Sequence, residues 1–327
     1  ANLDEIQAEV AAHWHAVLGS VQVKTPDRSM DIMLNGWFLY QALACRVWAR
    51  AAFYQASGAY GFRDQLQDGM ALTQSRPDLV REHLLRAASR QFVEGDVQHW
   101  WLPETGMGVR TRISDDRAWL ATAAAHYVEA TGDAAVLDEQ VTFLQGALLA
   151  PAENDRLFSP EIAVERASLF EHCARALDHS LTTGVHGLPL IGTGDWNDGM
   201  SRIGEGGKGE SVWLGWFLHT ALLAFAPLAE ARGDQRAAVW RAHAAALEPA
   251  LEAAWDGDWY LRAYFDDGAP LGTHKDGECR IDSIAQSWAV LSGVAPPERA
   301  ARAMESLQRE LVRPDDGLML VLTPPFD

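Results

Sequence analysis

The stretch Ala231-Arg232-Gly233-Asp234 joins two segments, residues 211–232 and 235–254, in which apolar side chains recur at three- and four-residue spacing. Glycine ends a helix because it readily adopts the left-handed conformation, and aspartate caps the next helix by accepting a backbone N–H bond. Ala130-Thr131-Gly132-Asp133 repeats this chemistry. Such short joints predict helices that pack as antiparallel pairs.

Helical periodicity extends over most of the chain, and alternating runs typical of strands are scarce. The sequence therefore predicts an all-α fold. We expect helices at residues 4–18, 32–56, 77–92, 116–131, 134–146, 161–183, 211–232, 235–254, 281–293 and 297–311.

The connections between the helix pairs are long and rich in Gly, Asp, Arg, Trp and His, and they cover residues 57–75, 93–115, 184–210 and 256–280. Long loops in a compact domain are usually functional. Short joints at one end and long polar loops at the other predict a helical toroid whose loops meet at one mouth. No linker divides residues 1–327, so we predict one domain, and both ends suggest a piece of a longer protein.

Charge limits the possible partners of the chain. The 327 residues include 27 Lys and Arg against 45 Asp and Glu, a formal net charge of −18. This charge disfavours nucleic acid and anionic membrane surfaces and favours a small neutral or locally captured substrate. The three cysteines lack disulfide or metal-ligand spacing, which favours a reducing compartment and a cytoplasmic location. Anchoring of a parent protein at the inner membrane stays open.

The stretch Gly194-Asp195-Trp196-Asn197-Asp198-Gly199-Met200 has the composition of a sugar site. We predict that Asp198 is the general acid and that Asp195 supplies a neighbouring charge, since protonating a sugar oxygen needs a carboxyl with a raised pKa. Asp195, Trp196 and Asn197 are predicted to bind the substrate, with the indole against the sugar ring. The alternative is a surface loop of Asx-turns above a packed tryptophan.

A second candidate segment, Gly108-Val109-Arg110-Thr111-Arg112-Ile113-Ser114-Asp115-Asp116, precedes the helix predicted at 116–131. In one interpretation Ser114 or Asp115 only caps this helix. In the other, Arg110 or Arg112 binds an oxyanion or hydroxyls while Asp115 or Asp116 clamps sugar hydroxyls. Two arginines beside a helix N-terminus also suit phosphate.

Three further residues are candidates for substrate binding. Arg63 and Asp64 lie in a polar aromatic segment and either pair within the protein or contact the ligand. Gln286 lies on one helix face with Glu278 and Asp282 and is predicted to face the mouth. Neither HExxH nor Ser-His-Asp spacing occurs, so we predict neither a metal nor acyl transfer.

These residues resemble the catalytic domain of glycoside hydrolase family 94, the cellobiose and chitobiose phosphorylases. The resemblance is greatest to the phosphorylase-like region of cyclic β-1,2-glucan synthases and to β-1,2-oligoglucan phosphorylases. The matching stretches are Tyr60-Gly61-Phe62-Arg63-Asp64-Gln65-Leu66-Gln67-Asp68, residues 91–101, Arg110 to Asp116, Gly194 to Met200, and residues 281–288.

The resemblance implies an (α/α)6 barrel and inverting phosphorolysis of a β-linked glucoside to α-glucose 1-phosphate. In the family the second Asp of the motif is the general acid, here Asp198, and the motif Trp, here Trp196, lines the donor sugar subsite. Arg110, Arg112 and Asp116 match residues that contact sugar or phosphate. Phosphate is the nucleophile, so one carboxyl suffices, and no cofactor is implied.

The family continues past Pro324-Pro325-Phe326 into a segment that helps to hold phosphate, and it carries an N-terminal β-sandwich. We therefore expect a barrel that is incomplete at its C-terminal end. Two alternative functions stay open: an inverting hydrolase with Asp115 or Asp116 as base, and a non-catalytic domain that binds glucan and gauges chain length in a synthase. A homodimer and a place within a larger synthase chain are both compatible with the resemblance.

Overall fold

The computed structural model describes residues 2–50 and 58–327, which divide into two compact units. Unit 1 comprises Ala1–Arg110, Ala123–Ala150 and Arg156–Cys173, so far as these are described. Unit 2 comprises Thr111–Thr122, Pro151–Asp155 and Ala174–Asp327. The single domain over residues 1–327 stays a prediction.

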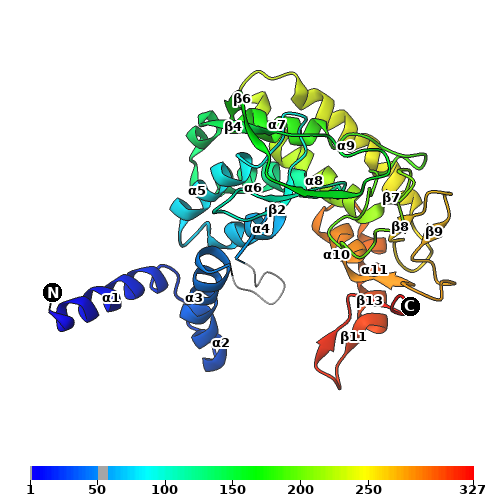
Figure 1. Ribbon diagram of the computed structural model, residues 1–327. Coiled ribbons are helices and arrows are strands. Elements are labelled where there is room, and N and C mark those ends of the chain that lie inside the picture. Colours follow the sequence, from blue (N-terminus) through cyan, green and yellow to red (C-terminus); the bar gives the residue numbers. More distant parts are fainter. Residues whose placement is uncertain (1, 51–57) are drawn as a thin grey trace. The chain divides into compact units, whose positions relative to one another are not determined.

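Helices occupy about half of the chain, as the apolar periodicity predicts (Figure 1). The α-helices are α1 (Leu3–Leu18), α2 (Arg28–Ile32), α3 (Phe38–Gln41), α4 (Phe62–Leu72), α5 (Pro77–Ala88), α6 (Asp116–Thr131), α7 (Leu169–Asp178), α8 (Val212–Glu230), α9 (Arg236–Ala253), α10 (Ser283–Leu291) and α11 (Pro297–Leu311). Other helical turns are η1 (Met33–Trp37), η2 (Ala42–Trp48) and η3 (Ala134–Asp138).

The strands are short, and most have two to four residues. They are β1 (Tyr60–Gly61), β2 (Gln98–Trp101), β3 (Gly108–Thr111), β4 (Gln140–Gln145), β5 (Asp155–Phe158), β6 (Glu161–Ser168), β7 (Glu210–Ser211), β8 (Ala263–Tyr264), β9 (Pro270–Leu271), β10 (Ile281–Asp282), β11 (Val312–Arg313), β12 (Leu318–Met319) and β13 (Leu322–Thr323).

One predicted helix is wrong, and another is wrong in its first part. Residues 134–146 form η3 followed by β4, and residues 161–168 form β6 before α7 begins. β4 and β6 pair as antiparallel strands, with Gln140 opposite Ser168. Both segments contain β-branched residues, and strand pairing is a long-range contact that local periodicity does not report. The strictly all-α prediction is therefore wrong, whereas the largely helical character is confirmed.

Other boundaries also differ from prediction. The helix predicted at 32–56 is helical to Trp48, and its residues 51–56 lie outside the described residues. The predicted loops contain regular elements: α4 within 57–75, β2 and β3 within 93–115, and β8 and β9 within 256–280. Residue 57 also lies outside the described residues. The segment 184–210 remains irregular until β7.

The core of unit 1 lies between α4, α5 and a small sheet. β1 and β3 flank β2, so that Tyr60 lies opposite Trp101 and Gln98 lies opposite Arg110. The fully buried Trp101 stacks on Tyr60 with a ring separation of 5.3 Å. Burial of such large rings contributes a substantial part of a core's stability.

The core of unit 2 is built around α8, which packs against α9 and α10 (Figure 1). In the joint that precedes α9, Gly233 has the predicted positive φ, +69°, and the Asp234 carboxylate accepts the Arg236 N–H at 2.9 Å, although the N-cap position itself is Gln235. Within the described residues, α8 is long and apolar enough to cross a membrane, but 72% of that window is buried inside the protein. A buried core helix has these same properties.

Candidate active site

The Asp-Trp-Asn-Asp stretch forms a tight loop in unit 2. The Asp195 carboxylate accepts the Asn197 N–H at 3.1 Å, and the Asn197 side-chain oxygen accepts the Gly199 N–H at 3.0 Å. Met200 follows and is buried beside Ile191. The predicted Asx-turns are therefore confirmed, and the second of them spans Asp198.

The carboxylate of Asp195 is fully buried and bound by a side chain from a distant part of the sequence. Arg262 donates to it in a bidentate manner, Nη1 to Oδ2 at 2.7 Å and Nη2 to Oδ1 at 2.6 Å. Ser211 Oγ also donates to Oδ2 at 2.6 Å. Charge-assisted bidentate pairs of this kind combine strength with a defined orientation.

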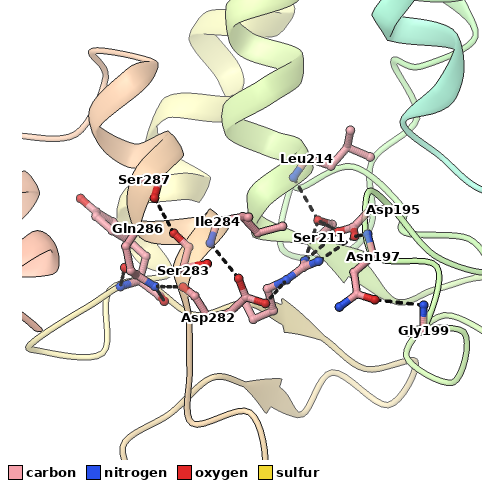
Figure 2. A network of polar contacts seen from close by, with 12 residues as sticks. Asp195, Asn197, Gly199, Ser211, Leu214, Asp282, Ser283, Ile284, Gln286 and Ser287 are labelled. Carbon is pink, nitrogen blue, oxygen red and sulfur yellow. Dashed lines mark hydrogen bonds and ion pairs between the residues drawn. The ribbon is translucent and has the colours of Figure 1, made fainter. Parts of the chain in front are cut away.

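Arg262 also connects the loop to two helix N-termini. Its Nε donates to Asp282 Oδ2 at 3.1 Å, while Oδ1 of Asp282 accepts the Ile284 N–H at the start of α10. Ser211 Oγ accepts the Leu214 N–H at the start of α8. Figure 2 shows these side chains converging from the loop, from α8 and from α10.

The ion pair changes the acidity of Asp195. Burial alone would raise the pKa of this carboxyl, but the charge and hydrogen bonds of Arg262, with help from Ser211, hold the pKa below its usual 3.8. For Asp282 burial prevails, and its pKa is raised despite the charge of Arg262. Of the two carboxyls that contact Arg262, Asp195 is therefore the one whose pKa is lowered.

The lowered pKa of Asp195 predicts a specific pH dependence of stability. A carboxyl whose pKa is lower in the folded state contributes stability above its unfolded pKa, and this contribution is lost as pH falls through the folded value. We expect the free energy of unfolding to fall more steeply below about pH 4 in the wild type than in Asp195→Asn. Urea titrations over the acid range would measure both slopes, and parallel slopes would contradict this expectation.

The second candidate segment lies directly against the loop. Ile113 forms a β-bridge with Gly192, and the Gly194 carbonyl accepts bonds from Ser114 N–H at 3.0 Å and Ser114 Oγ at 3.1 Å. The Thr193 N–H donates to the Arg112 carbonyl at 3.3 Å. Two motifs about 80 residues apart in the sequence are thus joined by backbone hydrogen bonds.

The side chains of the joined motifs differ in exposure. Trp196 is 40% exposed, and Asp198 and Arg112 are also exposed. The alternative in which the tryptophan is packed beneath the loop is therefore wrong. Arg112 is oriented through its Nε, which donates to the Glu153 carbonyl at 2.9 Å. The Trp196 indole, the Asp198 carboxyl and the Arg112 guanidinium are therefore exposed side chains of two segments that are hydrogen-bonded to each other.

Asp115 and Asp116 lie at the beginning of α6, and both are buried. The Asp115 carboxylate accepts the indole N–H of Trp119 at 3.0 Å, and its carbonyl accepts the Ala118 N–H at 3.0 Å. Asp115 thus contacts the first turn of α6 through its carbonyl and through Trp119, and capping by the side chain of Ser114 or Asp115 stays a prediction. Ligand contacts from either residue stay predictions.

Three residues predicted to bind substrate make hydrogen bonds within the protein. Asp195 is buried on Arg262, as described above. The buried Gln286 amide bonds to both backbone groups of Tyr260, each at 2.8 Å. Arg110, 1% exposed, donates to Asp96, Glu94 and two backbone carbonyls, and these bonds occupy its whole guanidinium. These three side chains are thus bonded within the protein, and their direct contact with substrate stays a prediction.

Arg63 and Asp64 lie in the first turn of α4 in unit 1. Arg63 is buried and Asp64 is partly exposed. Their ligand contacts stay predictions.

Among the residues that the structure describes, no three His, Cys, Asp or Glu side chains are grouped to hold a metal ion.

Sequence reasoning missed Arg262 and Ser211. Arg262 lies within Trp259-Tyr260-Leu261-Arg262-Ala263-Tyr264, a run that is otherwise apolar or aromatic. A single arginine in such a run predicts a buried guanidinium, and a buried guanidinium requires a carboxylate partner. That signal identifies the cation, but it does not show that Asp195 is its partner.

Comparison with known proteins identifies the family to which this chain belongs. The cyclic β-(1,2)-glucan synthase NdvB of Rhizobium meliloti (strain 1021) is 56% identical over 319 residues, 97% of this chain and 11% of the synthase. Solabiose phosphorylase of Paenibacillus borealis is 34% identical over 325 residues, 98% of this chain and 38% of the phosphorylase. The chain thus spans well under half the length of either relative.

A solved structure shares the fold at low identity. The GH63 mannosylglycerate hydrolase of Thermus thermophilus superimposes with a TM-score of 0.58 and 13% identity, covering 82% of this chain and 75% of that one. Residues 13–327 match the family model described as "Glycosyl hydrolase 94 superfamily, catalytic domain". The chain belongs to the glycosyl hydrolase 94 superfamily, as a catalytic domain.

Proposed function

We propose that the chain is the catalytic domain of an inverting glycoside phosphorylase, with Asp198 as general acid and inorganic phosphate as nucleophile. The observation that carries this proposal is the junction of the Asp198 loop with the Arg112 segment through the Ser114–Gly194 bonds. The junction holds a proton donor and an anion-binding side chain on one rigid frame. Preorganised groups of this kind account for much of catalytic rate acceleration.

The proposal assigns a role to each of five side chains of the joined segments. Asp198 donates its proton to the glycosidic oxygen, and Trp196 supports the apolar face of the donor sugar. Asn197 already uses its side-chain oxygen on Gly199, so its Nδ2 group is the one to donate to a hydroxyl. Arg112 binds phosphate, and Asp116 binds sugar hydroxyls.

The proposed reaction is a single displacement. A phosphate oxygen bonds to C1 from the face opposite the leaving group, the C1–oxygen bond breaks, and the departing oxygen takes the proton of Asp198. Inversion converts the β-glucoside into α-glucose 1-phosphate and a shortened saccharide with a free hydroxyl. A hydrolase would need a second carboxylate to activate water. Asp115 is disfavoured for that role because it is buried and bound to Trp119.

The relatives support a substrate class for this proposal. The identity of 56% with a cyclic β-(1,2)-glucan synthase supports a β-1,2-linked glucan, and the 34% identity with a phosphorylase supports phosphorolysis. We also propose that the helices belong to an (α/α)6 barrel. The contacts between α4 and α5, α8 and α9, and α10 and α11 support a fold built from helix pairs.

The direct test is product analysis with the full-length protein that contains this chain. Incubation with a β-1,2-glucooligosaccharide and phosphate is expected to release α-glucose 1-phosphate at a rate proportional to phosphate at low concentration. Anomer-resolved NMR would identify the product. Free glucose released at the same rate without phosphate would contradict the proposal and favour hydrolysis.

A second function is favoured by the synthase relative, which has the higher identity. In this alternative the domain only binds β-1,2-glucan and gauges its length. Calorimetry with the same oligosaccharide separates the two functions. Binding that depends on Trp196, with no sugar phosphate formed by the full-length protein, would favour the binding domain.

A further inference from the structure

Arg262 occupies a central position beneath the proposed acid loop. Its guanidinium is fully buried and contacts Asp195, Ser211 and Asp282, which belong to three separate segments of unit 2. Its backbone is also held on both sides, because its N–H donates to the Leu271 carbonyl at 2.8 Å and its carbonyl accepts the Val212 N–H at 3.2 Å. Arg262 is therefore immobilised relative to α8 and to β9.

The connection from Arg262 to Asp198 runs through short hydrogen bonds. Arg262 Nη2 donates to the Asp195 Oδ1 atom that also accepts the Asn197 N–H. Gly194, with φ +152°, closes the loop so tightly that a Cβ there would lie 3.4 Å from the Asp198 Cα. A displacement of the Asp195 carboxylate would thus move the backbone that carries Asp198.

We infer that Arg262 is a positioning residue for the proposed phosphorolysis, holding Asp195 so that the Asp198 carboxyl is aimed at the glycosidic oxygen. The inference rests on the proposed function. Arginine suits this task because its planar fork binds both Asp195 oxygens while Nε reaches Asp282. A lysine ammonium keeps the charge but cannot make the same bidentate contact.

Lysine at this position tests the geometry separately from the charge. We expect Arg262→Lys to lower kcat about 10- to 100-fold with little change in KM, since a misplacement of 1 Å costs about 100-fold in rate. The loss should be large for a glucooligosaccharide, whose leaving oxygen needs a proton. It should be small for a 2,4-dinitrophenyl β-glucoside, whose leaving group does not.

A purely structural role predicts a different result. Partial unfolding would reduce the rate on both substrates by the same factor, so an unchanged ratio of the two rates would overturn the inference. Arg299→Lys is the matched control, because Arg299 pairs with Glu252 at 2.6 Å away from the loop. We expect that variant to keep the wild-type rate on both substrates.

Hydrogen exchange provides a readout that does not depend on activity. The Asn197 and Gly199 amides are bonded within the loop, so they should exchange about 10-fold or more faster in Arg262→Lys if Arg262 holds the loop. If the wild type forms no sugar phosphate, the proposed function fails while this measurement still tests the loop. Unchanged protection of both amides would overturn the inference.

A second substitution covers the case in which Arg262→Lys does not fold. Asp195→Asn preserves the shape of the side chain and removes the charge that holds it to Arg262. We expect the same selective loss on the oligosaccharide substrate and the same faster exchange at Asn197 and Gly199. Equal losses on the two substrates, or wild-type protection, would again contradict the inference.

Discussion

Asp198→Asn is expected to reduce phosphorolysis of a β-1,2-glucooligosaccharide by about 10²- to 10⁴-fold, the usual contribution of a general acid. The amide has nearly the same shape as the carboxyl but has no proton to give to the departing oxygen. Binding should persist, because Trp196 and Arg112 are unchanged. Steady-state kinetics should therefore show the loss in kcat, with KM close to the wild-type value.

The leaving group provides the internal control for Asp198. A 2,4-dinitrophenyl β-glucoside departs without protonation, so Asp198→Asn should process it at nearly the wild-type rate. Glu205→Gln is the matched control, since Glu205 is an exposed carboxylate in the same irregular segment. Equal losses on both substrates, or wild-type activity of Asp198→Asn on the oligosaccharide, would exclude Asp198 as the acid.

Gly192→Ala is expected to lower the free energy of unfolding by about 2–4 kcal/mol, combining left-handed backbone strain with steric overlap. Gly192 has φ +63°, and an added Cβ would lie 2.0 Å from the Arg112 carbonyl oxygen. That oxygen belongs to backbone, so relief requires the Arg112 segment to move away from the loop. Phosphorolysis should fall as well, because this junction holds the two motifs together.

Gly207→Ala separates the backbone strain from the steric overlap that are combined in Gly192→Ala. Gly207 also has a positive φ, +77°, but nothing lies within 4 Å of the position that its Cβ would take. This variant should lose only about 1–2 kcal/mol, the cost of the left-handed conformation. Urea unfolding of both variants measures the difference, and equal losses would show that the close approach to Arg112 is unimportant.

The helices of unit 2 could be predicted closely from the sequence because their determinants are local. The helix predicted at 297–311 is α11 with the same bounds, and that at 235–254 differs from α9 by one residue at each end. Apolar spacing and the glycine and aspartate of the joint act within a few residues. The pairing of β4 with β6 joins residues that lie 16 to 28 positions apart, which explains why it was missed.

The sequence predicts which residue types make up the candidate site, but it does not predict which of these side chains pair with each other inside the protein. The Asp-Trp-Asn-Asp stretch indicated a sugar site or, as the alternative, a loop of Asx-turns above a packed tryptophan, and the structure has the turns together with an exposed Trp196. Which carboxylate is buried was not predictable, because Asp195 and Asp198 have the same chemistry and lie three residues apart. Arg262, 67 residues away from Asp195, decides between them.

By itself, the sequence determined the family, most of the helices and the residue types of the site, since these follow from local spacing and from motifs that can be recognised in one dimension. Tertiary structure alone decided that Asp195 pairs with Arg262, that Ser114 binds Gly194 and that Arg110 is fully engaged within the protein. Contacts between distant segments form only when the chain folds. The energy of a buried charge depends on the partner that folding brings to it.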